Sequence, residues 1–98
     1  MGTGIVRVGD LSTAHDCFPE RPAIEGSSNV LVNGKGVVRQ GDHWATHCCI
    51  TDGSQCHDGV SVGASSTVFV NGKPVMRVGD AISCGSVAEQ GSSDVSSG

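Results

Sequence analysis

The chain has 98 residues, among them fifteen glycines and five cysteines, but only two phenylalanines, one tryptophan and no tyrosine. A single domain this poor in large apolar side chains usually needs disulfides, metal ions or oligomerisation in place of a conventional core. The net charge of −4, with six lysines and arginines, excludes a basic surface for a phosphate backbone, and the few aromatic residues exclude a stacking platform for bases, so no nucleic-acid partner is expected.

The sequence also bears on the compartment in which the chain folds. Residues 1–4 do not begin a secretory signal peptide, which needs a basic stretch followed by an apolar run, and no apolar stretch approaches membrane-spanning length. An odd number of cysteines argues against a fully paired secreted disulfide framework. We therefore expect folding in a reducing cytoplasm and a chain that is soluble on its own.

The first predicted element is a turn at residues 7–10, Arg-Val-Gly-Asp, and the same Arg-x-Gly-Asp pattern returns at residues 39–42 and 77–80. In each copy the glycine supplies a backbone conformation that other residues avoid, and we expect the aspartate to cap the following turn by accepting backbone N–H groups. Three copies of one turn predict three similar units that close on one another, because short repeats cannot bury a core alone.

Two β-hairpins follow in chain order, within residues 27–42 and 65–80, which are identical at eleven of sixteen aligned positions. Each has Asn-Gly between short β-branched runs. This is the strongest short-range hairpin signal, because a type I′ turn needs positive φ at both central residues. The two-residue loop places Leu31 opposite Gly36 in the first hairpin and repeats the pattern at Phe69 in the second, so each hairpin has a thin apolar face.

The segments between the repeats are predicted to be irregular. Residues 16–26 and 48–63 contain cysteine beside glycine or proline, and no window of the chain keeps a helical periodicity. We expect one domain over residues 1–88 and a flexible Ser/Gly-rich tail over residues 89–98, which is low in complexity. The predicted fold class is therefore a small all-β domain of short β-hairpins.

A possible metal ligand follows each Arg-x-Gly-Asp turn. His15 and His47 stand five residues after the aspartate of the turn, and Cys84 stands four residues after it. Equivalent turns would aim these side chains inward, and His57 is the leading fourth ligand because its His-Asp dipeptide repeats that of His15. Three imidazoles and one thiolate make a closed tetrahedral zinc sphere, which is typical of a structural ion. We therefore predict one structural zinc ion per chain, bound by His15, His47, His57 and Cys84.

Alternative ligands stay open at this point. Cys48 could replace His47, and Cys56 could replace His57, since each cysteine is the neighbouring residue in the chain. His43 is a weaker candidate, because it directly follows the aspartate of the second turn and should point elsewhere.

Three features of the sequence resemble PAAR-repeat proteins, the family that caps the spikes of bacterial type VI secretion systems and contractile phage tails. They are the doubled Val-Asn-Gly-Lys-x-Val-x-Arg-x-Gly-Asp hairpins, the leading Arg-Val-Gly-Asp with its following histidine, and the closing Gly-Asp-x-x-x-Cys-Gly at residues 79–85. The likeness runs from about Ile5 to Gly85. It implies a cone-shaped, pseudo-threefold PAAR-type domain closed by one metal ion, a zinc held near the apex by three histidines and one cysteine, which map onto the four residues above.

From this resemblance we expect a non-enzymatic sharp tip that caps a trimeric β-helical spike of a contractile injection machine and helps it to pierce an envelope. One tip would sit on three spike chains, either a VgrG-like protein or a phage tail spike, and a separate effector could be carried with it. The protein would be made in the bacterial cytoplasm and delivered with the apparatus to the target envelope, where it would touch the membrane transiently.

Two other classes of function compete with this interpretation. A small binding module stapled by disulfides or zinc would have paired cysteines, for example a Cys49–Cys56 loop disulfide formed after export, whereas isolated cysteines such as Cys17 are most often inert and buried. A zinc hydrolase or deaminase would need an open metal position and a positioned glutamate. The chain contains neither His-Glu-x-x-His nor the deaminase signature, so an enzyme is not expected.

Overall fold

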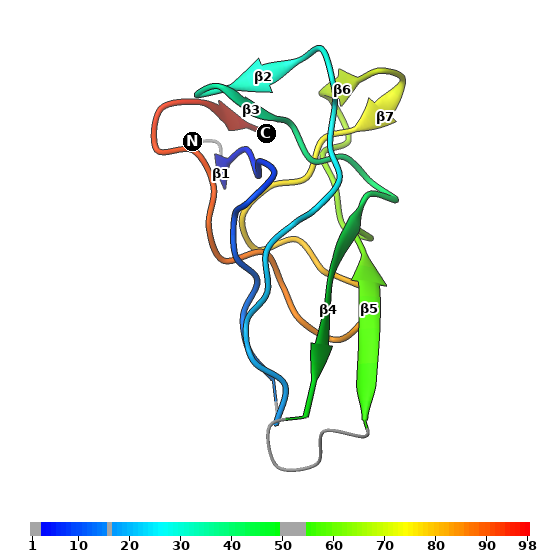
Figure 1. The fold of residues 1–98 in the computed structure, drawn as a ribbon. Helices are drawn as coiled ribbons and strands as arrows, with labels where there is room; N and C mark the ends of the chain where they lie inside the picture. Colours follow the sequence, from blue (N-terminus) through cyan, green and yellow to red (C-terminus); the bar gives the residue numbers. More distant parts are fainter. Residues whose placement is uncertain (1–2, 16, 50–54) are drawn as a thin grey trace.

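Short antiparallel strand pairs form the wide end of the molecule, and β4 and β5 extend from it to the narrow end (Figure 1). The computed structural model describes residues 3–15, 17–49 and 55–98, and its principal-axis extents are 39 × 26 × 22 Å. The strands in this part of the chain are β1 (Thr3–Gly4), β2 (Leu31–Val32), β3 (Lys35–Gly36), β4 (His43–Cys48), β5 (Cys56–Val60), β6 (Phe69–Val70), β7 (Lys73–Pro74) and β8 (Ser96–Ser97). The described residues contain no helix, as the sequence predicts, and so none that is long and apolar enough to cross a membrane.

The two Asn-Gly turns form the hairpins predicted from the sequence. Asn33 and Asn71 both have a φ of 55°, and the glycine after each also has a positive φ, which is the type I′ geometry. The predicted register is confirmed in both hairpins, with these opposed pairs: Leu31 and Gly36 in β2–β3, and Phe69 and Pro74 in β6–β7.

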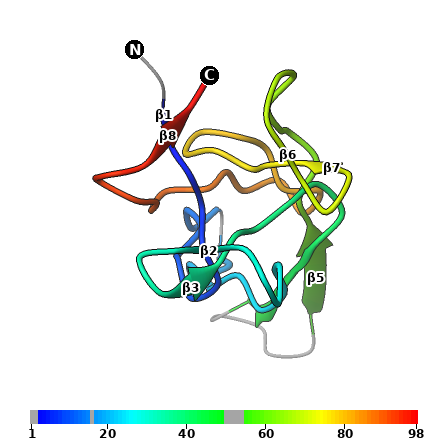
Figure 2. The same ribbon diagram turned by 90° about the horizontal axis from the view of Figure 1, so that it is seen from above.

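β1 and β8 come from opposite ends of the chain, and they pair where a third hairpin would lie (Figure 2). Gly4 lies opposite Ser96, the same register that the two hairpins have. The hydroxyl of Ser92 accepts hydrogen bonds from the backbone N–H groups two and three residues later, as that of Ser27 does in the first hairpin. The wide end therefore has three equivalent corners. The flexibility expected for residues 89–98 stays a prediction.

Closed rings of backbone hydrogen bonds join the three units. Val6 donates to Met76, Met76 donates to Val38, and Val38 donates back to Val6, with N···O distances of 3.0, 2.9 and 2.9 Å. All three side chains are fully buried and pack against one another. Because buried backbone groups need partners, each unit is satisfied only when the other two are in place.

The buried apolar side chains form small clusters instead of one large core. Among the described residues, one cluster contains Val6, Ala23, Val38, Trp44, Met76, Ile82 and Ala88, and the other contains Ile5, Val32, Val37 and Val75. Trp44 supplies the largest of these side chains, and its indole N–H donates a 2.9 Å hydrogen bond to the hydroxyl of Ser61, so that its polar group is satisfied inside the protein.

Each Arg-x-Gly-Asp turn is closed by its own arginine and aspartate. In the second copy, one carboxylate oxygen of Asp42 accepts the backbone N–H and the Nε–H of Arg39, both at 2.8 Å, and the other oxygen accepts Nη2–H at 3.0 Å. The other two copies have the same bonds. The expectation that the aspartate caps the following turn is wrong. The positive φ of Gly41, 88°, turns the chain back so that the carboxylate meets the residue three positions earlier.

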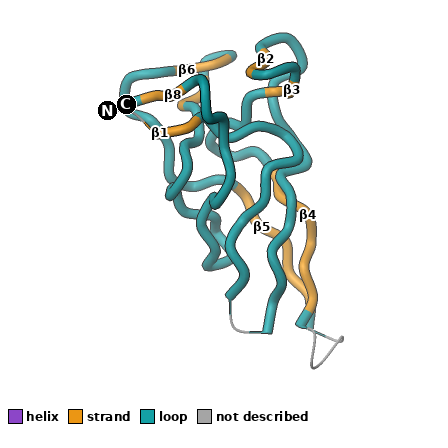
Figure 3. Tube along the Cα trace, turned by 90° about the vertical axis from the view of Figure 1, so that its left-hand side faces the viewer, coloured by secondary structure: helices purple, strands orange, loops and turns teal. Residues whose placement is uncertain are grey.

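The narrow end, which we call the apex, consists of three hairpins that continue the units (Figure 3). Residues 11–15 and 17–22 form the first apex hairpin, β4 and β5 the second, and residues 81–87 the third. The sequence predicted irregular structure over residues 48–63, but β5 lies within them. Its residues are Cys-His-Asp-Gly-Val, so the strand lacks the β-branched run that marks the hairpins of the wide end.

Candidate metal centre

The four side chains predicted as metal ligands come together at the apex. His15 lies in the first apex hairpin, His47 and His57 lie on β4 and β5 of the second, and Cys84 lies in the third. One ligand atom from each residue lies within 4.8 Å of the ligand atoms of the other three. The group therefore draws on every apex hairpin, and it could hold a metal ion.

Strand register and one glycine account for this convergence. His47 lies opposite His57 in the β4–β5 pair, and opposed residues in an antiparallel pair project from the same face. Gly59, two residues further along β5, leaves room for the third apex hairpin. A Cβ at this position would come within 3.2 Å of both the Cβ and the Sγ of Cys84. The absence of a side chain at Gly59 therefore lets the thiol approach β5.

The imidazole of His47 is held in a defined tautomer. Its Nδ1–H donates a 2.9 Å hydrogen bond to the backbone carbonyl of Pro19, so the lone pair of Nε2 faces the other imidazoles. Second partners of this kind commonly orient metal-binding histidines. The Nε2 atom of His47 lies 3.3 Å from that of His15 and 2.6 Å from that of His57.

These separations can be compared with those around a tetrahedral zinc ion. Zn–N bonds of about 2.0–2.1 Å place two nitrogen ligands roughly 3.3 Å apart. The pair His15 and His47 already has this separation, whereas His47 and His57 would need to move apart by under ~1 Å. The donor set, three imidazole nitrogens and one thiol, is one that zinc prefers, so the residues present fit the ion.

Phe18 lies against all three histidines. The centroid of its ring is 4.1 Å from that of His57, 5.0 Å from that of His47 and 5.1 Å from that of His15. Sequence reasoning did not single out this residue. Only its position three residues after His15, within the same hairpin, connects it with the ligands.

The surroundings of His57 favour its uncharged form. Burial lowers the pKa of this imidazole, and the neighbouring His47 and His15 lower it further, while Asp58 acts in the opposite direction. A neutral imidazole is the form that binds a metal ion. The local environment therefore prepares His57 for coordination at neutral pH.

His43 lies outside the group, as expected from its position in the repeat. Its side chain is exposed, and both its Nδ1–H and its backbone N–H donate to one carboxylate oxygen of Glu25, at 2.7 and 2.9 Å.

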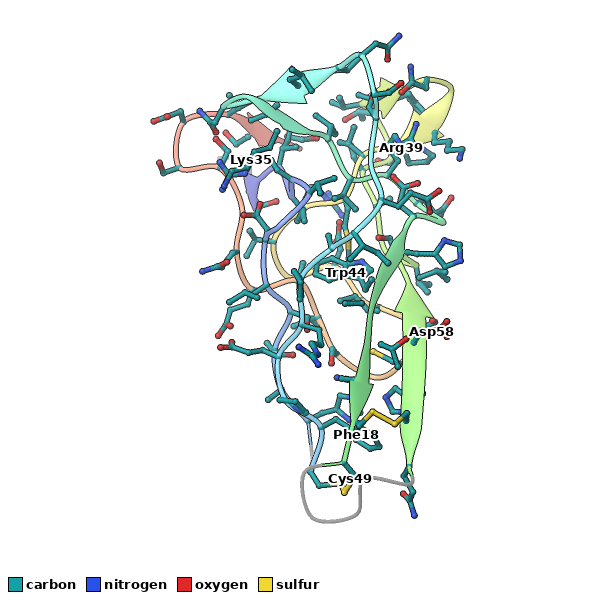
Figure 4. All side chains as sticks on the ribbon, viewed as in Figure 1. Phe18, Lys35, Arg39, Trp44, Cys49 and Asp58 are labelled. Atoms are coloured by element: carbon teal, nitrogen blue, oxygen red, sulfur yellow. A yellow bond between two sulfur atoms is a disulfide. The ribbon has the colours of Figure 1, made fainter. Side chains whose placement is uncertain are left out.

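Four cysteines form two disulfides among the described residues, Cys17–Cys49 and Cys48–Cys56, both at the apex (Figure 4). Cys48 and Cys56 are therefore not available as replacements for His47 and His57. The Cys49–Cys56 disulfide considered from the sequence is wrong, because Cys48 is the residue that lies opposite Cys56 in the β4–β5 register. Cys84 is in neither disulfide.

The fold and this site define a class of protein: a small all-β domain of three similar units, with a His/Cys group at the apex that could hold a metal ion. The sequence model of the PAAR motif matches residues 1–52 and again residues 45–90. The chain belongs to the PAAR motif family. The match supports a spike-tip type of protein of secretion or phage machinery. A comparison with curated proteins gives no match.

Proposed function

We propose that this protein is a non-enzymatic tip that caps the trimeric β-helical spike of a contractile injection machine. The wide end carries the proposal because its three corners are equivalent: Val30, Val68 and Val95 follow the same serine-centred turn and are 38%, 37% and 39% exposed. A face with approximate threefold symmetry fits the end of a homotrimer, so one chain would cap three spike chains.

Two further apolar side chains of the wide end would add to this contact. Leu31 on β2 and Phe69 on β6 are both 56% exposed, although they are among the largest apolar residues of the chain. The open end of a β-helix has unpaired backbone groups that a further layer of short strands can cover. The exposed side chains would bury apolar area in the same contact.

The test is the composition of a complex with the cognate trimeric spike. We expect a mass that corresponds to one tip and three spike chains. Leu31→Glu and Phe69→Glu should weaken the complex, since each places a charge in the apolar contact. Ile24→Glu is the matched control, because Ile24 is also exposed, at 58%, but lies outside the wide-end hairpins. Three tips per trimer, or equal weakening by all three variants, would contradict the proposal.

Within this function, one zinc ion would be held by His15, His47, His57 and Cys84 and would stabilise the apex. Four protein ligands fill a tetrahedral sphere and leave no position for a reactive water molecule, so the ion would have a structural role. When bound, it would link the three apex hairpins at one point and keep the narrow end from fraying under load.

The zinc site is tested by removing ligands. Cys84→Ser and His15→Ala should each lose the ion in native mass spectrometry and lower the unfolding temperature, by ~10 °C or more, because metal-binding energy is folding energy in small domains. His43→Ala, a histidine outside the group, should keep the ion. Full retention of zinc by both ligand variants would show that the site lies elsewhere.

The setting of the protein follows from this role. It would be made in the bacterial cytoplasm and carried at the end of a phage tail spike or a type VI secretion apparatus. It would reach the target envelope first, with transient contact with the membrane. A separate effector could travel with it.

One observation favours a second candidate, a disulfide-stapled binding module, because four of the five cysteines are paired. Such a module would have no need of the His/Cys group. Elemental analysis of the purified protein separates the two, since the spike tip should contain one zinc ion per chain and the binding module none.

A further inference from the structure

The two disulfides join the same parts of the apex that supply the histidines. Cys17–Cys49 spans 32 residues and links the first apex hairpin to the residue after β4. Cys48–Cys56 closes the end of the β4–β5 hairpin, with a Cα–Cα distance of 4.0 Å. Two of the three apex hairpins are therefore linked covalently to each other.

Both links lie directly beside the proposed ligands. Cys48 and Cys56 form the pair adjacent to His47 and His57 in the strand register. In the first apex hairpin, Cys17 stands two residues after His15. A change in any of these cysteines thus acts within one or two residues of an imidazole.

The third apex hairpin has no such link. Its cysteine, Cys84, belongs to the proposed metal site and is in neither disulfide. Backbone hydrogen bonds attach this hairpin to its neighbours, with Ser83 donating to the carbonyl of Val60 and Thr13 donating to that of Val87, both at 2.9 Å.

We propose that Cys17–Cys49 and Cys48–Cys56 are oxidative staples that hold the three imidazoles in place, so that only the Cys84 hairpin of the apex depends on the metal ion. The inference rests on the proposed zinc site. It assigns a role to four cysteines that the metal site does not use, and it makes the redox state of the chain a determinant of how firmly the ion is held.

Pairing these cysteines also settles which sulfur reaches the metal. Thiolates are favoured zinc ligands, and in a reduced chain Cys48 and Cys56 would be thiols directly beside His47 and His57. Disulfide sulfurs are no longer thiolate ligands. Oxidation therefore leaves Cys84 as the remaining thiol that can bind the ion.

Each staple forms by thiol–disulfide exchange with a small-molecule or protein disulfide donor. One thiolate of the chain attacks the donor disulfide and releases one donor thiol, and the second thiolate of the chain then displaces the other donor sulfur. Per bond, the chain loses two electrons and two protons, and the donor disulfide takes up the electrons and is reduced to thiols. A chain folded in a reducing compartment would acquire the staples on reaching an oxidising one.

The first test oxidises the full-length, zinc-loaded chain with glutathione disulfide and maps its bonds by mass spectrometry of non-reduced peptides. We expect the pairs Cys17–Cys49 and Cys48–Cys56, with Cys84 unpaired and protected from alkylation until the ion is removed. A disulfide that includes Cys84, or four cysteines that stay reduced in excess donor, would overturn the proposal.

The second test loads the oxidised and the reduced chain with Co²⁺ and follows its absorption while EDTA removes it. Release from the oxidised chain should be slower by ~tenfold or more, since the disulfides restrict the opening of the hairpins that carry the histidines. The thiolate-to-cobalt band should correspond to one sulfur in the oxidised chain. The control changes Cys17, Cys48, Cys49 and Cys56 to serine, and its release rate should not respond to the reductant.

The outcomes separate this inference from the function on which it rests. Equal release rates of Co²⁺ from the oxidised and reduced chains would contradict the role proposed for the two disulfides. This result would not contradict the metal site itself. Failure of both forms to bind Co²⁺ would overturn the metal site and this inference together. The complex of one tip with three spike chains is measured separately, so it tests the proposed function whatever the Co²⁺ results are.

Discussion

At the scale of single residues, Phe18 is a side chain whose ring lies close to all three histidines. Its ring packs against all three imidazoles and stacks on that of His57. The apolar surroundings of a metal site control the access of solvent to it, so Phe18 would position the ligands without binding the ion.

Phe18→Ala should therefore speed the loss of the ion more than it weakens the fold. We expect faster transfer of zinc to a chelator, by ~10-fold or more, in line with what outer-shell substitutions commonly do. Phe18→Leu should restore part of the retention, since it keeps the apolar contact. An unchanged transfer rate in Phe18→Ala would show that the ring only fills space.

The pair formed by His43 and Glu25 predicts a measurable pH response. The hydrogen bond from His43 lowers the pKa of Glu25 below 4.5, and the same bond raises the pKa of His43 above 6.5. The contribution of Glu25 to stability is present above pH 4.5 and lost as the pH falls through its lowered pKa. That of His43 is present below pH 6.5 and lost as the pH rises through its raised pKa. The pair is strongest between these two values.

NMR titration of the His43 ring checks this expectation. In Glu25→Gln the pKa of His43 should fall toward 6.5, whereas in Glu89→Gln, which changes a glutamate that is not paired with His43, it should not move. Equal titration curves in all three proteins would show that the pair does not form in solution.

At the scale of the structural elements, the Arg-x-Gly-Asp turns connect the units as well as closing themselves. Arg39 donates from Nη1 to the side-chain oxygen of Asn71 in the turn of the next hairpin, at 2.9 Å, and Arg7 reaches Asn33 in the same way. The repeated motif therefore fixes its own turn and the neighbouring hairpin with one side chain.

Asp42→Ala should be among the most destabilising substitutions in the chain. The side chain of Asp42 is 1% exposed and that of Arg39 is 11% exposed, so the change leaves a buried guanidinium without its partner, at a cost of about 3–5 kcal/mol. Asp80→Ala removes the equivalent pair at a more exposed site, where the side chain of Asp80 is 14% exposed and that of Arg77 is 25% exposed. This change should lower the free energy of unfolding by less. Urea unfolding measures both, and equal costs would contradict the argument from burial.

The elements differ in how far the sequence predicts them. The hairpins at Asn33 and Asn71 were predicted down to their register, because a two-residue type I′ turn sets the pairing locally. The β4–β5 hairpin was not predicted. The sequence between its strands contains Asp-Gly at residues 52–53, but no β-branched run follows this dipeptide. The inward residues of β4 are Trp44 and His47, so the pairing depends on packing in the apex.

At the scale of the whole molecule, the four members of the His/Cys group were predicted because three of them follow a repeated turn at a spacing of four or five residues, and equivalent turns aim such positions at one axis. The disulfide partners and Phe18 follow no such repeat. Their contacts arise where different hairpins meet, and sequence spacing within one hairpin holds no information about that meeting.

The pairing of β1 with β8 has a consequence for the order in which the chain folds. Thr3 pairs with Ser97, 94 residues later in the sequence. Contacts between residues so far apart in sequence form slowly, because a long loop must close before the contact can stabilise the fold. During synthesis two corners can assemble early, but β1 has to wait until residues 96 and 97 have left the ribosome. The complete wide face therefore forms only after residues 96 and 97 have been synthesised, and a nascent chain that lacks them cannot engage a partner that requires all three corners.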